Sequence, residues 1–183
     1  ARVATERTLV LVKPDAMQRG MAGEILARLE RRGLKIIGAK LVQADRALAE
    51  RHYAEHVGKG FYEGLVSFIT AIPVLALALQ GERAIEVARQ TMGATDPAKA
   101  APGTIRGDYG LTVGRNLVHG SDSPERGEEE IRLWFSMDEL SDYEHGEILK
   151  YSKIYSRYTA YKSHTHFIYI YICISIYLSL VPA

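Results

Sequence analysis

The feature that most limits how this chain can fold is a short apolar run near its start, Thr8–Val12, followed at once by Lys13-Pro14-Asp15. A run this rich in valine, without polar alternation, predicts a strand buried in a sheet. Proline has no N–H to donate to a strand ladder, so the strand must end before Pro14. The sequence therefore predicts a buried strand at residues 8–12.

The chain from there to about residue 135 alternates strand and helix patterns. Gly33 is placed to end the first helix, because glycine readily adopts the left-handed conformation that follows a helix. Ser123 and Pro124 are a suitable N-cap and first-turn proline for the last helix. Strands are expected at 34–42, at 73–79 with Gly81 closing it, and from 116 to 118; helices are expected behind Met21, at 46–56, at 61–70, at 82–92 and from 123 to about 135. This order predicts an α/β sandwich (α+β) of the split βαβ type.

Residues 93–115 have no sustained period and contain two prolines and five glycines. They are expected to form a long ordered loop. Loops of this length inside a compact domain are usually functional.

The last part of the chain, 146–183, has a different composition from the rest. It carries seven of the eleven tyrosines, and isoleucine alternates strictly from Ile168 to Ile176. Residues 167–181 are uncharged but too few for a membrane-spanning helix, which needs about 20. Three interpretations remain open: an additional strand, a short membrane-seeking anchor, or a non-native or poorly ordered extension. We expect this segment to lie outside the core domain, 1–145.

Composition excludes several classes of protein. A formal net charge of +1 argues against a constitutive nucleic-acid binder. The single cysteine, Cys173, allows no internal disulfide and no cysteine-based metal site, as is usual in a reducing compartment. Residues 1–7 lack the apolar stretch of a signal peptide. We therefore expect a cytoplasmic protein whose core does not associate with a membrane.

The chain has no glycine-rich phosphate-binding motif, neither GxxxxGK[ST] nor GxGxxG. If it binds nucleotides, side chains must supply the positive charge. Arginine forks suit bidentate contact with phosphate, and lysine acts as a point charge. The candidates around the long loop are Lys13, Arg89, Arg106 and Arg115, with the hydroxyls of Thr95 and Tyr53.

His119 follows the last predicted strand, in Asn116-Leu117-Val118-His119-Gly120-Ser121-Asp122. A neutral imidazole has one nucleophilic nitrogen that can accept a phosphoryl group. The other nitrogen needs a partner, for which Glu130 on the next helix is the candidate, with Ser121 bracing Glu130. Gly120 would let a phosphate approach the backbone. The alternative is a core histidine with no chemical role.

Three segments, Lys13-Pro14-Asp15, Gly103-Thr104-Ile105-Arg106-Gly107-Asp108 and Asn116–Asp122, occur in an order and spacing that resemble the nucleoside diphosphate kinase family. The resemblance runs from about Glu6 to Tyr143. It implies a ferredoxin-like fold, with a four-stranded antiparallel sheet covered by helices, in a catalytic domain at 1–145. It also implies transfer of the γ-phosphoryl group from a nucleoside triphosphate to a nucleoside diphosphate, by a ping-pong route through a phosphohistidine, which maintains nucleoside triphosphate pools.

The resemblance assigns a role to each matching residue. His119 would be the nucleophile, held by Glu130 with Ser121 alongside. Mg²⁺ would be held mainly by the substrate phosphates rather than by a dedicated protein site. Lys13 and Tyr53 would contact the transferring phosphoryl group, Arg89, Thr95 and Arg106 the outer phosphates, Asn116 the ribose, and Phe61, Leu65 and Val113 the base.

The resemblance further implies a homo-oligomer, with residues 93–115 forming part of a subunit contact. The sequence does not decide between hexamer and tetramer, nor does it rank nucleosides or reveal additional partners.

Two other functions compete with this interpretation. His52-Tyr53-Ala54-Glu55-His56 fits the H-x-x-E-H pattern of an inverted zinc peptidase. The simpler explanation is two surface histidines on an ordinary helix. The second competitor is a catalytically silent module that keeps a nucleotide pocket, although the chain retains His119.

Overall fold

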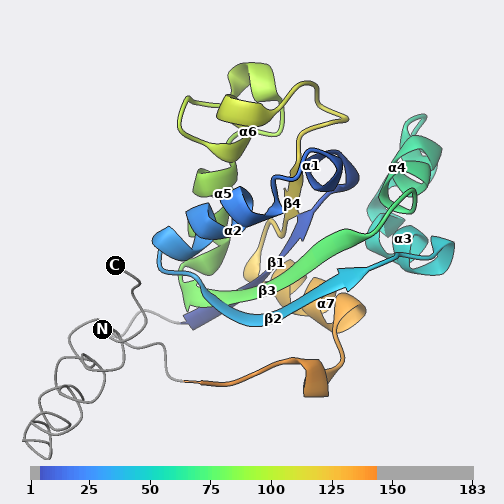
Figure 1. The fold of residues 1–183 in the computed structure, drawn as a ribbon. Helices are drawn as coiled ribbons and strands as arrows, with labels where there is room; N and C mark the ends of the chain where they lie inside the picture. Colours follow the sequence, from blue (N-terminus) through green and yellow to red (C-terminus); the bar gives the residue numbers. More distant parts are fainter. Residues whose placement is uncertain (1–4, 144–183) are drawn as a thin grey trace, which may run out of the picture. The chain divides into compact units, whose positions relative to one another are not determined.

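The computed structural model describes residues 5–143, whose centre is a four-stranded antiparallel sheet with helices on both faces (Figure 1). The strand order is β2-β3-β1-β4, so the buried strand predicted near the N-terminus occupies an inner position. This is the predicted ferredoxin-like α/β sandwich. The strands are β1 (Thr5–Val12), β2 (Lys35–Val42), β3 (Val74–Glu82) and β4 (Val118–Gly120).

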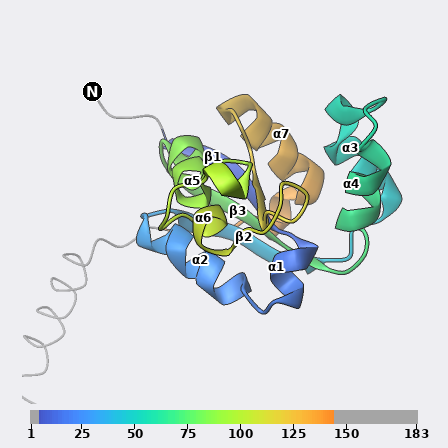
Figure 2. The ribbon, with the colours of Figure 1, turned by 90° about the horizontal axis from the view of Figure 1, so that it is seen from above.

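Strand β1 is apolar at consecutive positions because both of its faces are covered. Leu9 and Leu11 pack into a core cluster that contains Ile131 of helix α7 (Pro124–Trp134). Val10 and Val12 pack into a second cluster that contains residues of α2 (Ala22–Arg31) and α5 (Ala84–Met92). Figure 2 shows α2 and α7 on opposite sides of the sheet.

The helices begin and end at residues that the local sequence dictates. Side chains of Asp45, Thr104 and Ser123 cap three helix N-termini. Gly33 has φ +81°, as predicted for the residue that ends α2. The α-helices are α1 (Pro14–Gln18), α2 (Ala22–Arg31), α3 (Arg46–His52), α4 (Tyr62–Ile69), α5 (Ala84–Met92), α6 (Ile105–Tyr109) and α7 (Pro124–Trp134); 3₁₀ turns are η1 (Ala54–His56), η2 (Pro97–Lys99) and η3 (Met137–Glu139).

Three details differ from the sequence prediction. Strand β3 does not close at Gly81 but continues to Glu82, because β1 extends back to Thr5 and pairs with it. The last strand is 118–120 rather than 116–118, since Leu117 takes a left-handed φ of 72°. The long loop contains the short helix α6, which the glycines around it obscured.

Within residues 5–143, no helix is long and apolar enough to cross a membrane. The three interpretations of 146–183 concern residues outside the described range.

Candidate active site

His119 is positioned by the pairing of the short strand β4 with β1, in which His119 lies opposite Leu11. The turn before β4 is fixed by Asp15, whose Oδ2 accepts a hydrogen bond of 3.0 Å from the Leu117 N–H. Asp15 is buried, and sequence reasoning gave it no role. The only signal was its place in the Lys13-Pro14-Asp15 segment. It holds the unusual backbone of Leu117 that directs β4 into the sheet.

A chain of hydrogen bonds fixes the tautomer of His119. The Leu9 N–H donates to Ser121 Oγ at 3.1 Å, and the Ser121 hydroxyl donates to Glu130 Oε2 at 2.6 Å. The two carboxylate oxygens of Glu130 lie 3.1 and 3.2 Å from His119 Nε2. Because an ionised carboxylate only accepts, Nε2 must carry the proton. Nδ1 of His119 is therefore the unprotonated, nucleophilic nitrogen.

Glu130 stays ionised although it is 4% exposed. Burial raises its pKa, but the hydrogen bond and charge of His119, together with the Ser121 hydroxyl, outweigh burial and lower the pKa to about 2. Sequence reasoning missed Arg126, whose Nη2 is 3.6 Å from Glu130 Oε1. The only signal for Arg126 in the sequence was its position one helical turn before Glu130.

His119 opens into a pocket of about 550 Å³. The pocket contains every predicted site residue except Ser121, which is buried beside Glu130. Arg115, considered from sequence as a phosphate ligand, is exposed in a turn with Thr112 and does not line this pocket. The predicted residues that line it are Lys13, Tyr53, Phe61, Leu65, Arg89, Thr95, Arg106, Val113, Asn116, His119 and Glu130.

Lys13 is buried and lines this pocket, and its ammonium donates to Asn116 Oδ1 at 2.6 Å. The Asn116 amide donates in turn to the Thr95 carbonyl oxygen at 2.8 Å. Burial lowers the pKa of Lys13 to about 8; Asp15 opposes this shift and Arg106 adds to it. The lysine is therefore charged at neutral pH but titrates within an accessible range.

Arg106 on α6 faces the pocket and also links the long loop to β4. Its guanidinium donates to the carbonyl oxygens of Gly93 at 2.9 Å, Val118 at 2.7 Å and Asn116 at 3.3 Å. Burial and the charge of Arg89 lower the pKa of Arg106 to about 10. A guanidinium has five N–H donors, so donors remain for an anion in the pocket.

The outer part of the pocket is apolar. Phe61 and Val113 are about half exposed there, at 55% and 56%, and Leu65 lies beside them. His56 packs edge-on against Phe61, with ring centroids 5.6 Å apart. Two exposed apolar side chains facing a pocket provide a slot for a flat, aromatic ligand.

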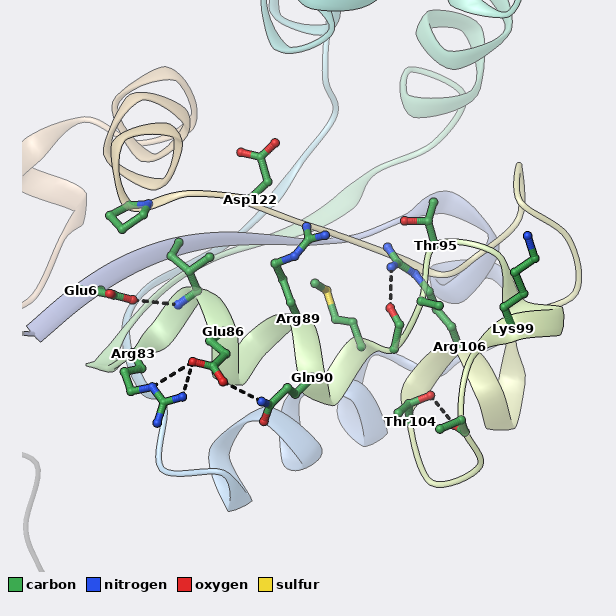
Figure 3. A pocket seen from close by; sticks show the side chains of 16 residues that line it. Glu6, Arg83, Glu86, Arg89, Gln90, Thr95, Lys99, Thr104, Arg106 and Asp122 are labelled. Atoms are coloured by element: carbon green, nitrogen blue, oxygen red, sulfur yellow. Dashed lines mark hydrogen bonds and ion pairs between the residues drawn. The ribbon is translucent and has the colours of Figure 1, made fainter.

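A second pocket has a volume of about 730 Å³. Figure 3 shows the side chains that line it. Although larger, it lacks His119, Glu130 and the apolar slot. The two pockets share Arg89, Thr95, Arg106 and Asp122. Arg89 and Arg106 thus stand at the boundary between the two pockets, and of the two only the smaller contains His119 with its hydrogen-bonded carboxylate.

His52 and Tyr53 form the wall beside His119. The His52 ring packs edge-on against His119, with centroids 4.5 Å apart, and its Nδ1 accepts from Trp134 Nε1 at 3.3 Å. Burial, strengthened by the charge of His119, lowers the pKa of His52 to about 3. Burial and the charge of Glu130 raise the pKa of Tyr53 to about 12. Both side chains are neutral at physiological pH.

The zinc-peptidase pattern does not form a zinc site of that kind. Helix α3 ends at His52, and His56 lies in η1 beyond it, so the two histidines do not share one continuous helix face. Nor is His52 a surface residue, as the simpler explanation held, because it is 3% exposed. Among residues 5–143, no group of metal-ligating side chains includes His56.

Packing gives a further reason for a glycine at position 120. A Cβ at this position would stand 2.4 Å from Met92 Cε, inside the core of α5 and β4. The glycine thus admits Met92 to the backbone, and because Gly120 also lines the pocket of His119, the approach of a phosphate there stays a prediction.

Comparison with known proteins gives the family. The sequence model of "Nucleoside diphosphate kinase" matches residues 6–140. A nucleoside diphosphate kinase of Thermomicrobium roseum is 62% identical over 139 residues, covering 76% of this chain and 93% of the relative. The solved structure of a halophilic nucleoside diphosphate kinase from Halobacterium salinarum in complex with CDP superposes with a TM-score of 0.75 at 53% identity, covering 78% of this chain and 95% of that one. A family protein from Babesia bovis gives the same TM-score at 42% identity, covering 77% and 95%.

The fold and the pocket thus define a phosphotransferase that works through a histidine. The chain belongs to the nucleoside diphosphate kinase family. It transfers the γ-phosphoryl group of a nucleoside triphosphate to a nucleoside diphosphate by the family's ping-pong mechanism, through a phosphohistidine.

Proposed function

We propose that His119 Nδ1 is the nucleophile of this reaction and that the other pocket residues hold the nucleotide around it. The observation that carries this proposal is the contact between Glu130 and His119 Nε2, at 3.1 and 3.2 Å, which leaves Nδ1 unprotonated. Attack by Nδ1 on the γ-phosphorus forms the N–P bond as the bond to the diphosphate oxygen breaks. The ring then carries a positive charge, which the adjacent carboxylate stabilises. A second nucleoside diphosphate reverses the step.

The phosphates have a matching set of cations. Phosphoryl transfer has a loose transition state, so catalysis depends mainly on positioning and on stabilising charge. We propose that Lys13 and Tyr53 contact the transferring group and that Arg89, Thr95 and Arg106 bind the outer phosphates, because all five line the pocket with His119.

The base and ribose would occupy the outer part of the same pocket. We propose that Phe61, Leu65 and Val113 hold the base by stacking and apolar contact, and that Asn116 binds the ribose. Stacking accepts any base, because every base has a π-face. The Halobacterium salinarum relative was solved with CDP, which supports a nucleoside diphosphate as the ligand.

We propose Mg²⁺ as the cation that accompanies the nucleotide. The one group of three metal-ligating side chains within residues 5–143 contains two histidines and one glutamate. Mg²⁺ prefers oxygen ligands and usually binds through substrate phosphates. This donor set therefore does not fit Mg²⁺ and supports its delivery with the nucleotide, where it neutralises phosphate charge.

We also propose a homo-oligomer. Strand β2 is at one edge of the described sheet, and its Leu41 is 66% exposed. Leu111, in the loop expected to contact another subunit, is 68% exposed. Apolar residues at such positions suit protein–protein contact. Sedimentation velocity would test the assembly: a monomer at micromolar concentration contradicts it, and hexamer or tetramer is read from the mass.

We make three further proposals from the sequence arguments given above. They are a catalytic domain at 1–145, a separate extension at 146–183 and a cytoplasmic location. Mass spectrometry of the purified protein would show whether the extension is present. Limited proteolysis, followed by an activity assay of the remaining fragment, would test whether it belongs to the catalytic domain.

The central experiment is labelling with γ-³²P-ATP and Mg²⁺. We expect an acid-labile, base-stable phosphoprotein in the wild type and no labelling of His119→Ala. His56→Ala is the matched control, because it removes another histidine of the same pocket and should still be labelled. Full labelling of His119→Ala would contradict the assignment of the nucleophile.

A further inference from the structure

His52 is a buried histidine beside the nucleophile that the transfer reaction does not use. Its Nδ1 is 3.9 Å from Glu130 Oε1, and its ring meets that of His119 edge-on. Its Nε2 is buried and has no hydrogen-bond partner among residues 5–143. A buried polar nitrogen without a partner lowers the stability of the fold. A function for it is therefore worth seeking.

Metal-ligating atoms of His52, His119 and Glu130 all lie within 4.8 Å of one another. A tetrahedral zinc ion has bonds of about 2.0–2.2 Å to nitrogen and oxygen, which places its ligand atoms roughly 3.3 Å apart. The separations here are 3.1 Å between His119 Nε2 and Glu130 Oε1 and 3.9 Å between Glu130 Oε1 and His52 Nδ1. Around one ion these atoms would draw together from separations of up to 4.8 Å, and zinc would take the place of the Trp134 N–H that His52 Nδ1 accepts at 3.3 Å.

We propose that the nucleotide-free enzyme binds one Zn²⁺ ion through His52, His119 and Glu130, and that this ion blocks phosphorylation of His119. Two imidazoles and one carboxylate are a typical zinc donor set. The fourth position would be left for water. The binding of zinc stands by itself, and its inhibitory effect rests on the proposed role of His119 as the nucleophile.

A separate cavity offers a path for the ion. It has a volume of about 200 Å³ and shares only Arg126 and Glu130 with the nucleotide pocket. Its carboxylates, Glu129 and Glu130, attract a cation, while Arg51 and Arg126 repel it. Arg126 is 3.6 Å from Glu130 and must move as the ion enters, so we expect moderate rather than tight affinity.

Inhibition follows from the imidazole chemistry. Zinc takes the lone pair of Nε2, so the single ring proton of neutral His119 moves from Nε2 to Nδ1. Glu130 exchanges its hydrogen bond from Nε2 for a bond to the metal. No proton is released, but Nδ1 no longer has a free lone pair. The inhibition should therefore persist at saturating nucleotide concentration.

The binding test is isothermal titration of nucleotide-free protein with Zn²⁺ at neutral pH. We expect one site in the wild type and affinity at least 10-fold weaker in His52→Gln. Glu130→Gln is the second variant if the first does not fold, as judged by circular dichroism. His56→Gln is the matched control and should bind zinc as the wild type does. The lack of a zinc site in the wild type would overturn the proposal. So would a loss of zinc affinity in His56→Gln without a loss in His52→Gln.

The inhibition test measures phosphohistidine formation after preincubation with zinc. Each protein is compared with its own rate without zinc, and a chelator should restore that rate. An unchanged rate in zinc-loaded wild type would overturn the inhibitory role. If the zinc-free wild type forms no phosphohistidine, the proposed nucleophile fails, whereas the titration still decides the metal site.

Discussion

The Ser121 hydroxyl donates to Glu130 Oε2 at 2.6 Å while its oxygen accepts the Leu9 N–H at 3.1 Å. This small side chain thus connects the carboxylate that orients His119 to the backbone of the central strand β1. Glu130 cannot rotate away from His119 without losing a hydrogen bond to a charged group. The tautomer of His119 is therefore set by a contact with the sheet itself.

We expect Ser121→Ala to slow phosphorylation of His119 by about 10-fold or more. The change removes a hydrogen bond to a charged group, worth about 1.5–3 kcal/mol, and leaves the Leu9 N–H without its acceptor. The free energy of unfolding should fall by a comparable amount. Single-turnover labelling with ATP and urea unfolding would measure the two effects.

Ser123→Ala provides the control for Ser121→Ala. Ser123 caps α7 through the Arg126 N–H at 3.2 Å, and loss of a cap costs about 1 kcal/mol of stability. It makes no hydrogen bond to Glu130 within the described residues. In Ser123→Ala, the rate at which His119 is phosphorylated should stay close to that of the wild type. An equal loss of rate in both variants would mean that stability alone, and not the orientation of Glu130, controls the reaction.

We expect kcat/KM to fall as the pH rises through about 8, because burial lowers the pKa of Lys13 to about that value. Above it the lysine is neutral in the free enzyme and no longer attracts phosphate. The pH dependence of kcat/KM reports groups of the free enzyme. In Lys13→Arg, the alkaline decline should move to higher pH, whatever the loss of absolute rate. A decline at the same pH in that variant would assign it to another group.

The same lysine predicts how stability depends on pH. Its pKa is about 8 in the folded protein against 10.5 for a free lysine. Between these values the unfolded chain binds more protons, so the contribution of Lys13 to the free energy of unfolding rises with pH. The cost of burying the charge is fully present below pH 8. Comparing urea unfolding of the wild type and Lys13→Met between pH 7 and 10 would isolate this contribution.

Most of the fold could be predicted because periodicity and caps act locally. The valine-rich strand β1, the end of α2 at Gly33 and the start of α7 at Ser123 depend on neighbours in sequence. The extension of β3 past Gly81 could not be predicted in this way. It depends on pairing with Thr5 and Glu6, more than 70 positions away.

In the candidate site, too, contacts that are local in sequence could be predicted and distant ones could not. The pairing of His119 with Glu130 and Ser121 follows from a strand, a turn and a helix in succession, and it was predicted. Asp15 and His52 come from distant segments, and their contacts with Leu117 and His119 appear only when α1, α3 and β4 are assembled. The packing of Met92 against Gly120 was missed for the same reason, since Met92 belongs to α5.

We expect Glu130→Gln to lower the rate of phosphorylation about 10- to 100-fold. An amide can still accept from His119 Nε2, but it loses the charge-assisted part of a hydrogen bond worth about 1.5–3 kcal/mol and no longer stabilises a positive ring. Single-turnover labelling measures this loss. A rate within 2-fold of the wild type would show that the charge of Glu130 is dispensable.

Acid unfolding gives an independent test of the ionised Glu130. Its pKa is about 2 in the folded protein against 4.5 for a free glutamate. The stability that it contributes is present above pH 4.5 and is lost as the pH falls toward 2. Glu130→Gln should therefore show a shallower loss of stability across this interval than the wild type. Parallel acid profiles for the two proteins would contradict an ionised, stabilising Glu130.

Finally, Phe61→Ala should weaken the binding of all nucleoside diphosphates by a similar factor. Stacking of a base on an aromatic ring is worth about 1–3 kcal/mol, or roughly 5- to 150-fold in Kd. Phe61 is 55% exposed, so its removal should change the free energy of unfolding little. Val57→Ala is the control, since Val57 is 64% exposed in the same segment and does not line the pocket. Titration with ADP, CDP and GDP measures the effect. A loss confined to one base would show that Phe61 selects bases rather than stacking on all of them.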